Sequence, residues 1–413
     1  MATIYSARAN MRKADTYSVM SASSHVPSTI NYINKQQHAS KRKVLARLFT
    51  KTALRDVKDQ ILRHVNTFCA GLAGENYQPA WGAPKNIAAW SDYLTLNIIN
   101  NLCYGKAFGL LREETHRYIP NIISCCFFQP KIAKYKLNHI FLSTISSQIQ
   151  QFGGWIKQQA DARKAAFAGT TSSTSPARDF FAHLSSPQPG NATQSAPTRK
   201  EIWVELLQLV IAGADTTAVA ISGVFFHLLH TPSALSQTTA EILHTFDSYS
   251  DIRPGAKLRS CKFLHACINE ALRLSPPVTG LAPRTVLRGG IEVDGVHFPE
   301  GTIVGSPIYA LHRNSAYFAQ PDSFVPGRWL SGEGGEDTYS AAGGRVPFCP
   351  FSVGPRSCVA RRLAMDEISV AIARTLFLYE LRLDGEWEGK EEYQLKGWMT
   401  SSREGPFVQF RSR

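Results

Sequence analysis

The stretch Glu201–Leu229 is the most apolar part of this chain, and it limits what the chain can fold into. As a helix, residues 206–229 would be about 36 Å long, which is enough to cross a lipid bilayer. However, Gly213, Asp215 and Thr216 interrupt the apolar run near its centre, and an ionised carboxylate in mid-bilayer costs several kcal/mol. We therefore expect a long helix buried inside a large protein. A membrane transporter would need further spans, which the chain lacks.

Helical periodicity dominates the first two-thirds of the chain. It predicts helices over residues 41–49, 53–72, 90–103 and 140–167. Residues 169–197 are rich in Ser, Thr, Pro and Gly, which is typical of a surface connection. Within that connection we expect one short helix at 179–184.

Short β-strands are expected beyond Pro276. Residues 290–298 read Gly-Ile-Glu-Val-Asp-Gly-Val-His-Phe, a pattern typical of a β-hairpin with an Asp-Gly turn. We also expect a strand within 302–309, a Gly-rich loop at 332–344, a helix that ends near Leu378, and alternating strands after it. The chain should therefore be mainly α-helical with small β-sheets.

Composition narrows the class of partner. The net charge of +13 follows from 45 basic and 32 acidic residues, and it suits an anionic membrane surface or an acidic protein. Basic residues do not form a stripe interleaved with aromatics, so we expect no nucleic-acid partner. The eight cysteines are scattered without a CxxC pair, which favours a reducing compartment and excludes typical zinc spacing. Residues 1–13 show neither a targeting peptide nor an apolar span.

A decapeptide near the C-terminus, Phe351-Ser-Val-Gly-Pro-Arg-Ser-Cys358-Val-Ala360, places a cysteine between a Gly-containing loop and a helix start. The N–H groups of a helix terminus and a nearby arginine should lower the pKa of Cys358. A thiolate held in this way is a good axial ligand for haem iron. The alternative is a buried structural cysteine, the usual state of a free cysteine.

A second motif, Ala212-Gly-Ala-Asp-Thr-Thr217, lies in the middle of the apolar stretch. A hydroxyl that bonds a carbonyl of its own helix opens the helix locally, and small residues leave room for oxygen and water. In the alternative reading, Thr216 simply satisfies the preceding turn.

These motifs identify a family resemblance. The chain resembles the cytochrome P450 family of haem-thiolate monooxygenases, most closely its fungal microsomal type, along essentially all 413 residues. The family's cysteine-loop pattern is matched at Phe351, Gly354, Arg356 and Cys358, while Ala360 replaces its final glycine. The resemblance implies a triangular α-helical prism around a buried haem. It also implies one domain over 1–413, made of an N-terminal helical half (1–168), a surface connection (169–199) and a haem- and oxygen-binding part (200–413).

The resemblance also implies roles for single residues. Cys358 would ligate the iron of haem b (iron protoporphyrin IX), Phe351 would pack near its sulfur, and Ala212 and Gly213 would border the oxygen site. Thr216 would hydrogen-bond oxygen and Asp215 would relay protons to it.

Arginines bind carboxylates bidentately, and the resemblance assigns Arg42, Arg284 and Arg356 to the haem propionates. His38 stands where the family has tryptophan, and it can still donate a hydrogen bond. Locally, Arg42 could also belong to a solvated basic run.

The family's bracing network is a Glu-x-x-Arg pair with a later arginine. Glu270, Arg273 and Arg328 match it, with Gly327 and Trp329 replacing the usual residues beside Arg328. We expect this triad to be structural.

Membrane-bound members begin with an anchor helix and early strands. Judged by their spacing, about 80–100 residues would precede Met1, and a small sheet without those strands would expose an unpaired edge. The resemblance implies the cytoplasmic side of the endoplasmic reticulum, whereas this chain without an anchor would be soluble or peripheral.

The implied reaction is insertion of one oxygen atom from O2 into an apolar small molecule, by hydroxylation or epoxidation, in secondary-metabolite biosynthesis. Electrons would come from NADPH through NADPH-cytochrome P450 reductase, and we expect a monomer. One alternative is a relative that rearranges or dehydrates its substrate without a reductase, which the pair of Asp215 and Thr216 argues against. The other is a haem-binding but inactive truncated remnant.

Overall fold

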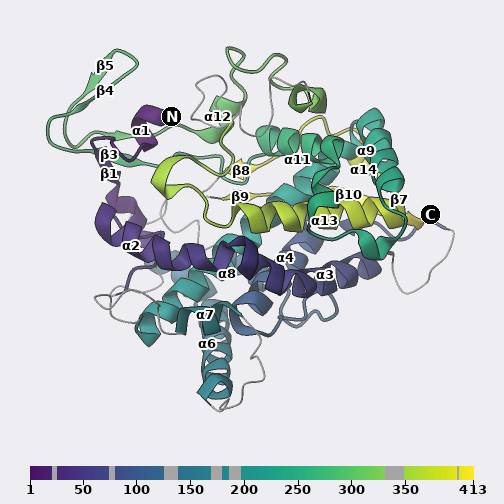
Figure 1. Cartoon of the computed structure of the whole chain (residues 1–413), viewed down its shortest axis with the longest axis horizontal. Coiled ribbons are helices and arrows are strands. Elements are labelled where there is room, and N and C mark those ends of the chain that lie inside the picture. The colour runs from purple at the N-terminus through teal and green to yellow at the C-terminus, as the bar shows by residue number, and fades with distance from the viewer. Residues whose placement is uncertain are drawn as a thin grey trace.

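A 31-residue helix, α8 (Arg199–Leu229), runs through the middle of the molecule (Figure 1). It begins with a capping box, in which the hydroxyl of Thr198 accepts from the backbone N–H of Glu201 while the carboxylate of Glu201 accepts from the N–H of Thr198. Of the described helices, α8 is the one long and apolar enough to cross a membrane, but 78% of its apolar window is buried inside the protein. The expected buried central helix is confirmed.

The computed structural model describes residues 1–20, 26–73, 80–124, 138–168, 179–185, 197–330, 348–397 and 400–413. Helices make up most of this part of the chain. Besides α8 they are α1 (Ala2–Tyr5), α2 (Lys35–Ala46), α3 (Lys51–Ala73), α4 (Ile87–Tyr104), α6 (Asn138–Ala168), α7 (Phe180–Ser185), α9 (Pro232–Thr245), α10 (Ala256–Arg259), α11 (Lys262–Leu274), α12 (Ile308–His312), α13 (Arg361–Leu378) and α14 (Gly385–Glu388). Short 3-10 helices lie at Asp15–Met20, Arg47–Phe49, Tyr249–Asp251, Pro326–Trp329 and Gly354–Arg356.

The strands are short and antiparallel, and they form small separate sheets. They are β1 (Met11–Lys13), β2 (Lys85–Asn86), β3 (Arg284–Val286), β4 (Ile291–Val293), β5 (Val296–Phe298), β6 (Ile303–Val304), β7 (Tyr379–Leu383), β8 (Lys396–Gly397), β9 (Ser401–Ser402) and β10 (Phe407–Ser412). The described sheets have the strand orders β1-β3-β6, β2-β10-β7, β4-β5 and β8-β9. The first brings Lys13 opposite Arg284, although 271 positions of sequence separate them.

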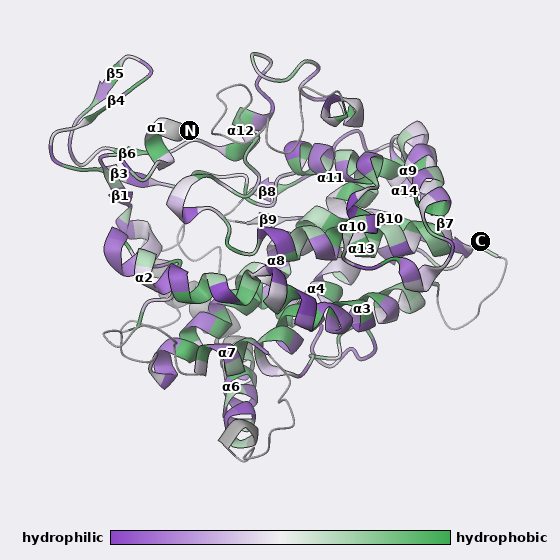
Figure 2. Cartoon of the chain, viewed as in Figure 1, coloured by the Kyte–Doolittle hydropathy of each residue, from purple (hydrophilic) through white to green (hydrophobic). Residues whose placement is uncertain are grey.

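The core lies where α4, α8, α11 and α13 pack together, and Figure 2 shows hydrophobic residues gathered along these inner helices. Gly213 allows α8 to approach α4 closely, since a Cβ at this position would lie 3.0 Å from the side chain of Ile99. A long apolar helix is thus covered on all sides by other helices, as its composition requires.

Most expected elements are confirmed, including the helix that ends at Leu378. The β4–β5 hairpin turns at Asp294 and Gly295, whose φ angles of 51° and 79° are those that a tight Asp-Gly turn requires. The strand expected within 302–309 is only partly right, because β6 ends at Val304 and α12 begins at Ile308. Residues 332–344, and most of 169–197 apart from α7, lie outside the described residues.

Candidate active site

The loop that carries Cys358 is shaped by its glycine. Gly354 has a φ of 75°, and a Cβ there would collide with the backbone carbonyl oxygen of Tyr5 in α1. The loop then closes through a hydrogen bond of 2.8 Å from the N–H of Cys358 to the carbonyl oxygen of Phe351. Ala360, where the family has glycine, adopts φ −95° and ψ 12°, which alanine reaches without strain. Cys358 is therefore fixed just before the first turn of α13.

The sulfur of Cys358 has an unusual position among the described cysteines. It belongs to an exposed residue, whereas Cys69, Cys103, Cys261, Cys267 and Cys349 are buried. The surrounding protein still desolvates a thiolate at this position, and this effect raises the pKa of Cys358. The N–H of Ala360 and the guanidinium groups of Arg42 and Arg361 lower that pKa by less. The expectation that the protein alone depresses the pKa of Cys358 is therefore wrong, because desolvation outweighs the favourable groups.

Basic side chains from distant parts of the chain converge beside this loop. Arg42 of α2 donates to the carbonyl oxygen of Ser357 at 2.6 Å. Arg356 donates to the carbonyl oxygens of Tyr32 and Ile33 at 2.6 and 3.1 Å. The propionate-binding arginines proposed from the sequence thus make hydrogen bonds with backbone groups, and these bonds leave their positive charges unneutralised.

Arg284 and Lys13 lie opposite each other on β3 and β1. The guanidinium group of Arg284 stacks 4.8 Å from the ring centroid of Tyr5, and the ammonium group of Lys13 lies 4.0 Å from that of Tyr17. His38, on the buried face of α2, completes the group. We call Lys13, His38, Arg42, Arg284 and Arg356 the basic cluster.

The electrostatics of the basic cluster show mutual repulsion. Burial, followed by the charges of Arg356 and Arg284, lowers the pKa of Lys13 to about 6. Burial and the neighbouring cations lower the pKa of His38 to about 3, and that of Arg356 falls to about 10. Within the described part of the chain, no member forms an ion pair with a carboxylate. A buried set of cations without acids fits a ligand that brings carboxylates of its own, as haem does.

Lys13 was not identified from the sequence. It stands in a short mixed run without any recognisable pattern, and only the pairing of β1 with β3 brings it to Arg284. Its pKa, far below that of an exposed lysine, is the signal that places it in the cluster.

The segment 212–217 lies within α8. The hydroxyl of Thr216 donates to the carbonyl oxygen of Ala212 at 2.7 Å, which is the local bond expected from the sequence. Asp215 is buried and its carboxylate pairs with Arg403, 3.3 Å away. The same geometry satisfies Thr216 within its own turn, so its part in chemistry stays a prediction.

Glu270, Arg273 and Arg328 do come together. The carboxylate of Glu270 lies 2.8 Å from Arg273 and 3.1 Å from Arg328, and it also accepts from the indole N–H of Trp329 at 2.9 Å. Arg273 further donates to the carbonyl oxygens of His312 and Ser323, both at 2.9 Å. The contacts tie α11 to the segment that precedes the cysteine loop.

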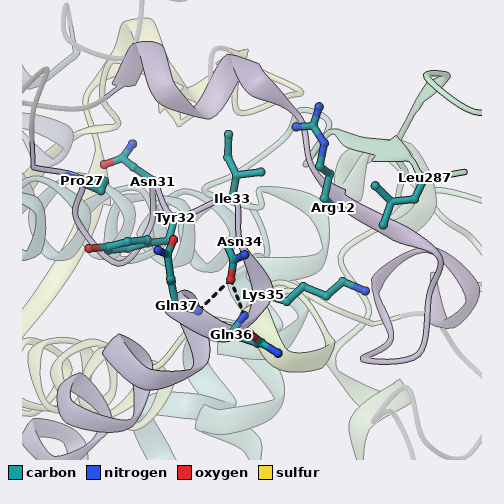
Figure 3. Close-up of a pocket in the computed structure, with 10 residues that line it drawn as sticks. All are labelled: Arg12, Pro27, Asn31, Tyr32, Ile33, Asn34, Lys35, Gln36, Gln37 and Leu287. Atoms are coloured by element: carbon teal, nitrogen blue, oxygen red, sulfur yellow. Dashed lines mark hydrogen bonds between the residues drawn. The ribbon is translucent and has the colours of Figure 1, made fainter. Parts of the chain in front are cut away.

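A pocket of about 800 Å³ opens next to the basic cluster (Figure 3). It lies between β1 and the beginning of α2, and its lining includes Arg12, Asn31, Tyr32, Lys35 and Leu287. The side chain of Asn34 caps α2 here by accepting from two backbone N–H groups. The pocket and the cluster are connected, because Arg356 of the cluster donates to the backbone of Tyr32, which lines the pocket.

Comparison with known proteins agrees with this geometry. The family model for Cytochrome P450 matches residues 8–406. The cytochrome P450 monooxygenase apf7 of Gibberella fujikuroi is 32% identical over 441 residues, a match that covers 99% of this chain and 82% of the relative. AKT7 of Alternaria alternata is 29% identical over 99% of this chain and 81% of its own length. A cytochrome P450 monooxygenase of Gibberella zeae is also 29% identical, over 99% of this chain and 97% of its own length.

Among solved structures, the crystal structure of a cytochrome P450 (CYP102L1) has a TM-score of 0.78 to this chain at 19% identity, covering 98% of this chain and 85% of the other. At that identity the likeness speaks for the fold. The family model spans nearly the whole chain, and its relatives are named monooxygenases. With this fold and this site, the chain belongs to the cytochrome P450 family, and it is an oxidoreductase of the haem-thiolate class.

Proposed function

We propose that this enzyme inserts one atom of dioxygen into an apolar small organic molecule, by hydroxylation or epoxidation, in fungal secondary metabolism. The observation that carries the proposal is the position of Cys358 beside the basic cluster, which has no carboxylate partner among the described residues. The fungal origin of the relatives supports the metabolic setting.

The residues present fit haem. Cys358 would ligate the iron as a thiolate, the form that binds metals, although burial alone raises the pKa of its thiol. The basic cluster would hold the two propionates, with His38 as a neutral N–H donor because its pKa is so low. Phe351 would pack beside the sulfur, and Ala212 and Gly213 would border the oxygen site. When bound, haem supplies activation of dioxygen and transfer of one oxygen atom, while the protein positions substrate and moves protons.

Thr216 and Asp215 are the residues that we assign to proton movement. The hydroxyl of Thr216 donates a hydrogen bond to the carbonyl oxygen of Ala212, so its oxygen keeps lone pairs that can accept a hydrogen bond from a proton donor in the site. Asp215 is the next residue on α8, and we assign it the exchange of protons with the site.

The proposed partner is a flavoprotein, NADPH-cytochrome P450 reductase. Arg361 and Arg362 begin α13, directly after the loop of Cys358. Lys41 of α2, which pairs with Glu201, stands beside Arg42, and Arg42 bonds Ser357 of that loop. These three basic residues would form a docking face for an acidic partner. We propose a monomer at the cytoplasmic face of the endoplasmic reticulum or free of the membrane.

A carbon monoxide difference spectrum tests the site. The reduced, haem-loaded protein should show the thiolate-type absorption, and Cys358→Ser should abolish it. Cys349→Ser, in the same loop, should retain it. A chain that folds but incorporates no haem would contradict the proposal, and a haem-loaded chain without turnover would favour the alternative of an inactive haem-binding remnant.

A second experiment tests the proton assignment. Apolar compounds that perturb the haem spectrum would be identified first, and the share of NADPH electrons lost as hydrogen peroxide would then be measured with them. Thr216→Ala should raise that share, whereas the neighbouring Thr217→Ala should leave it near the parent value. Equal shares in both variants would refute the role of Thr216.

A further inference from the structure

Three buried charged side chains meet on the side of α8 that faces α4. One terminal nitrogen of Arg403 lies 2.6 Å from the carboxylate of Asp92, and the other lies 3.3 Å from that of Asp215. The exposed fractions of the side chains are 3% for Arg403, 17% for Asp92 and 6% for Asp215. One guanidinium group therefore pairs with two acids. Asp92 belongs to α4, Asp215 to α8, and Arg403 to the segment between β9 and β10.

The charges of this group do not balance. Two ionised carboxylates and one guanidinium leave a net charge of −1 in a buried space, which is costly. Two tyrosines also face this group electrostatically: Tyr93, the neighbour of Asp92, and Tyr393, whose hydroxyl donates to the carbonyl oxygen of Gly405 at 3.0 Å. Among the described residues, no second cation pairs with either acid. One proton shared between Asp92 and Asp215 would make the group electrically neutral.

The hydrogen bonds of the group show where that proton can reside. Arg403 lies 2.6 Å from the carboxylate of Asp92 but 3.3 Å from that of Asp215, and Oδ2 of Asp215 is buried and receives no hydrogen bond from Arg403, with the hydroxyl of Thr400 as a nearby donor. A proton removes most of the desolvation penalty on the carboxylate that the cation stabilises less. Arg403 itself keeps its proton, because the two acids raise its pKa further. The exchangeable proton therefore belongs to the carboxyl groups.

The direction of the pKa shifts agrees with a shared proton. Burial raises the pKa of Asp92 to about 6, with Arg403 opposing this effect and Asp215 adding to it. Burial also raises the pKa of Asp215, while Arg403 and the hydroxyl of Thr400 lower it. Because the two acids share one cation, the titration belongs to the pair.

We propose that Asp92 is a positioning residue for Asp215: by competing for Arg403, it keeps Asp215 able to hold a proton next to Thr216. Because Arg403 lies closer to Asp92 (2.6 Å) than to Asp215 (3.3 Å), Asp92 is the acid that stays ionised and Asp215 carries the shared proton. Without the charge of Asp92, Arg403 would pair with Asp215 alone and hold it ionised. The inference rests on the proposed function, in which Asp215 moves protons.

The alternative is a structural clamp in which the ion pairs only hold α4, α8 and the chain before β10 together. A clamp needs no proton, and it would make the state of each acid independent of the other. The two readings therefore differ in how the acids titrate.

Infrared difference spectroscopy distinguishes them without turnover. The haem-loaded protein would be labelled with carboxyl-¹³C aspartate, and the band of protonated carboxyl groups would be followed from acid to neutral pH. The parent should show one buried carboxyl that titrates above the usual range of an aspartate. Asp92→Asn and Asp215→Asn should each abolish it, because either change leaves a neutral one-to-one ion pair. Asp322→Asn, which removes an acid paired with an arginine at the surface, should leave the band unchanged.

The result that overturns the proposal is a band that survives in either buried variant, or a parent without such a band. Arg403→Gln should have the opposite effect on the band. Loss of the cation should protonate both acids and strengthen the band. This variant therefore tests the proposal even if an Asn variant does not fold. The carbon monoxide spectrum separates the two proposals. A protein with a normal carbon monoxide spectrum but no shared proton would refute this inference alone. A protein with the expected infrared titration but without the thiolate spectrum would confirm the shared proton. That second result would refute the proposed function and, with it, the role of Asp92.

Discussion

Replacing Glu270 with glutamine tests how much the buried bracing network contributes to stability. The carboxylate of Glu270 accepts five hydrogen bonds, from Arg273 (two), Val325, Arg328 and Trp329, at 2.8–3.1 Å. A glutamine amide turns one of the two oxygens into a donor. Whichever oxygen is lost, at least two of these donors would face an N–H group, and two buried guanidinium groups would lose their counter-charge.

The expected size follows from the burial of the pair. Glu270 and Arg273 have fully buried side chains, and removing one partner of a buried ion pair costs about 3–5 kcal/mol. For a chain of 413 residues, the entropy of unfolding is about 0.9 kcal/mol per kelvin at the midpoint. The midpoint temperature of Glu270→Gln should therefore fall by about 3–6 °C.

Scanning calorimetry of the haem-loaded protein at one scan rate is the assay, and Glu114→Gln is the matched control. Glu114 and Arg117 form the same i,i+3 pair at the same 2.8 Å, but the Glu114 side chain is 85% exposed. Such a pair contributes no more than about 0.5 kcal/mol, so the midpoint should move by less than about 1 °C. Equal shifts in the two variants would show that burial does not decide the strength of the Glu270 network.

The remaining predictions concern the cofactor site. Gly354→Ala should lose most haem, because it forces a Cβ into the carbonyl of Tyr5 at a positive φ. The control Gly389→Ala, which adds its Cβ in open space, should keep haem. The ratio of haem to protein absorbance measures haem retention in both variants. The pKa of Lys13, about 6, should rise beside the carboxylates of haem, so at about pH 8 haem binding should add one proton at Lys13 while the thiol of Cys358 loses one. Calorimetry in buffers of different ionisation enthalpy measures the proton balance. Lys13→Met should shift that balance toward release by about one proton, and an unchanged balance would contradict the prediction. Arg356→Gln should weaken haem retention and speed proteolysis within residues 26–34; unchanged cleavage would argue against the contact with Tyr32 and Ile33.

Local patterns in the sequence were sufficient for much of the fold. The Asp-Gly turn between β4 and β5 involves neighbours in the chain, so the residues themselves indicate the geometry. The apolar residues of 302–309 predict a strand but allow either structure, and in the fold β6 ends at Val304 and α12 begins at Ile308.

The residues of the site also differ in how far the sequence alone could predict them. Cys358 and Glu270 stand in motifs whose members are close together in the chain, and the structure brings the triad into contact. Lys13, Asp92 and Arg403 carry no local signal, since each stands alone and meets its partners across hundreds of residues. The pKa of Cys358 could not be judged from its neighbours in sequence, because desolvation depends on everything packed around the loop.

The bonds from Arg356 to the backbone of Tyr32 and Ile33 have a consequence for how this enzyme responds to its surroundings. The same arginine faces the basic cluster on one side and supports the wall of the 800 Å³ pocket on the other. If binding at both sites favours the same ordered state of this backbone, the two sites are thermodynamically linked, and linkage is reciprocal. A compound that binds the pocket and favours the ordered wall then raises the affinity of the protein for haem. Haem raises the affinity for that compound by the same factor.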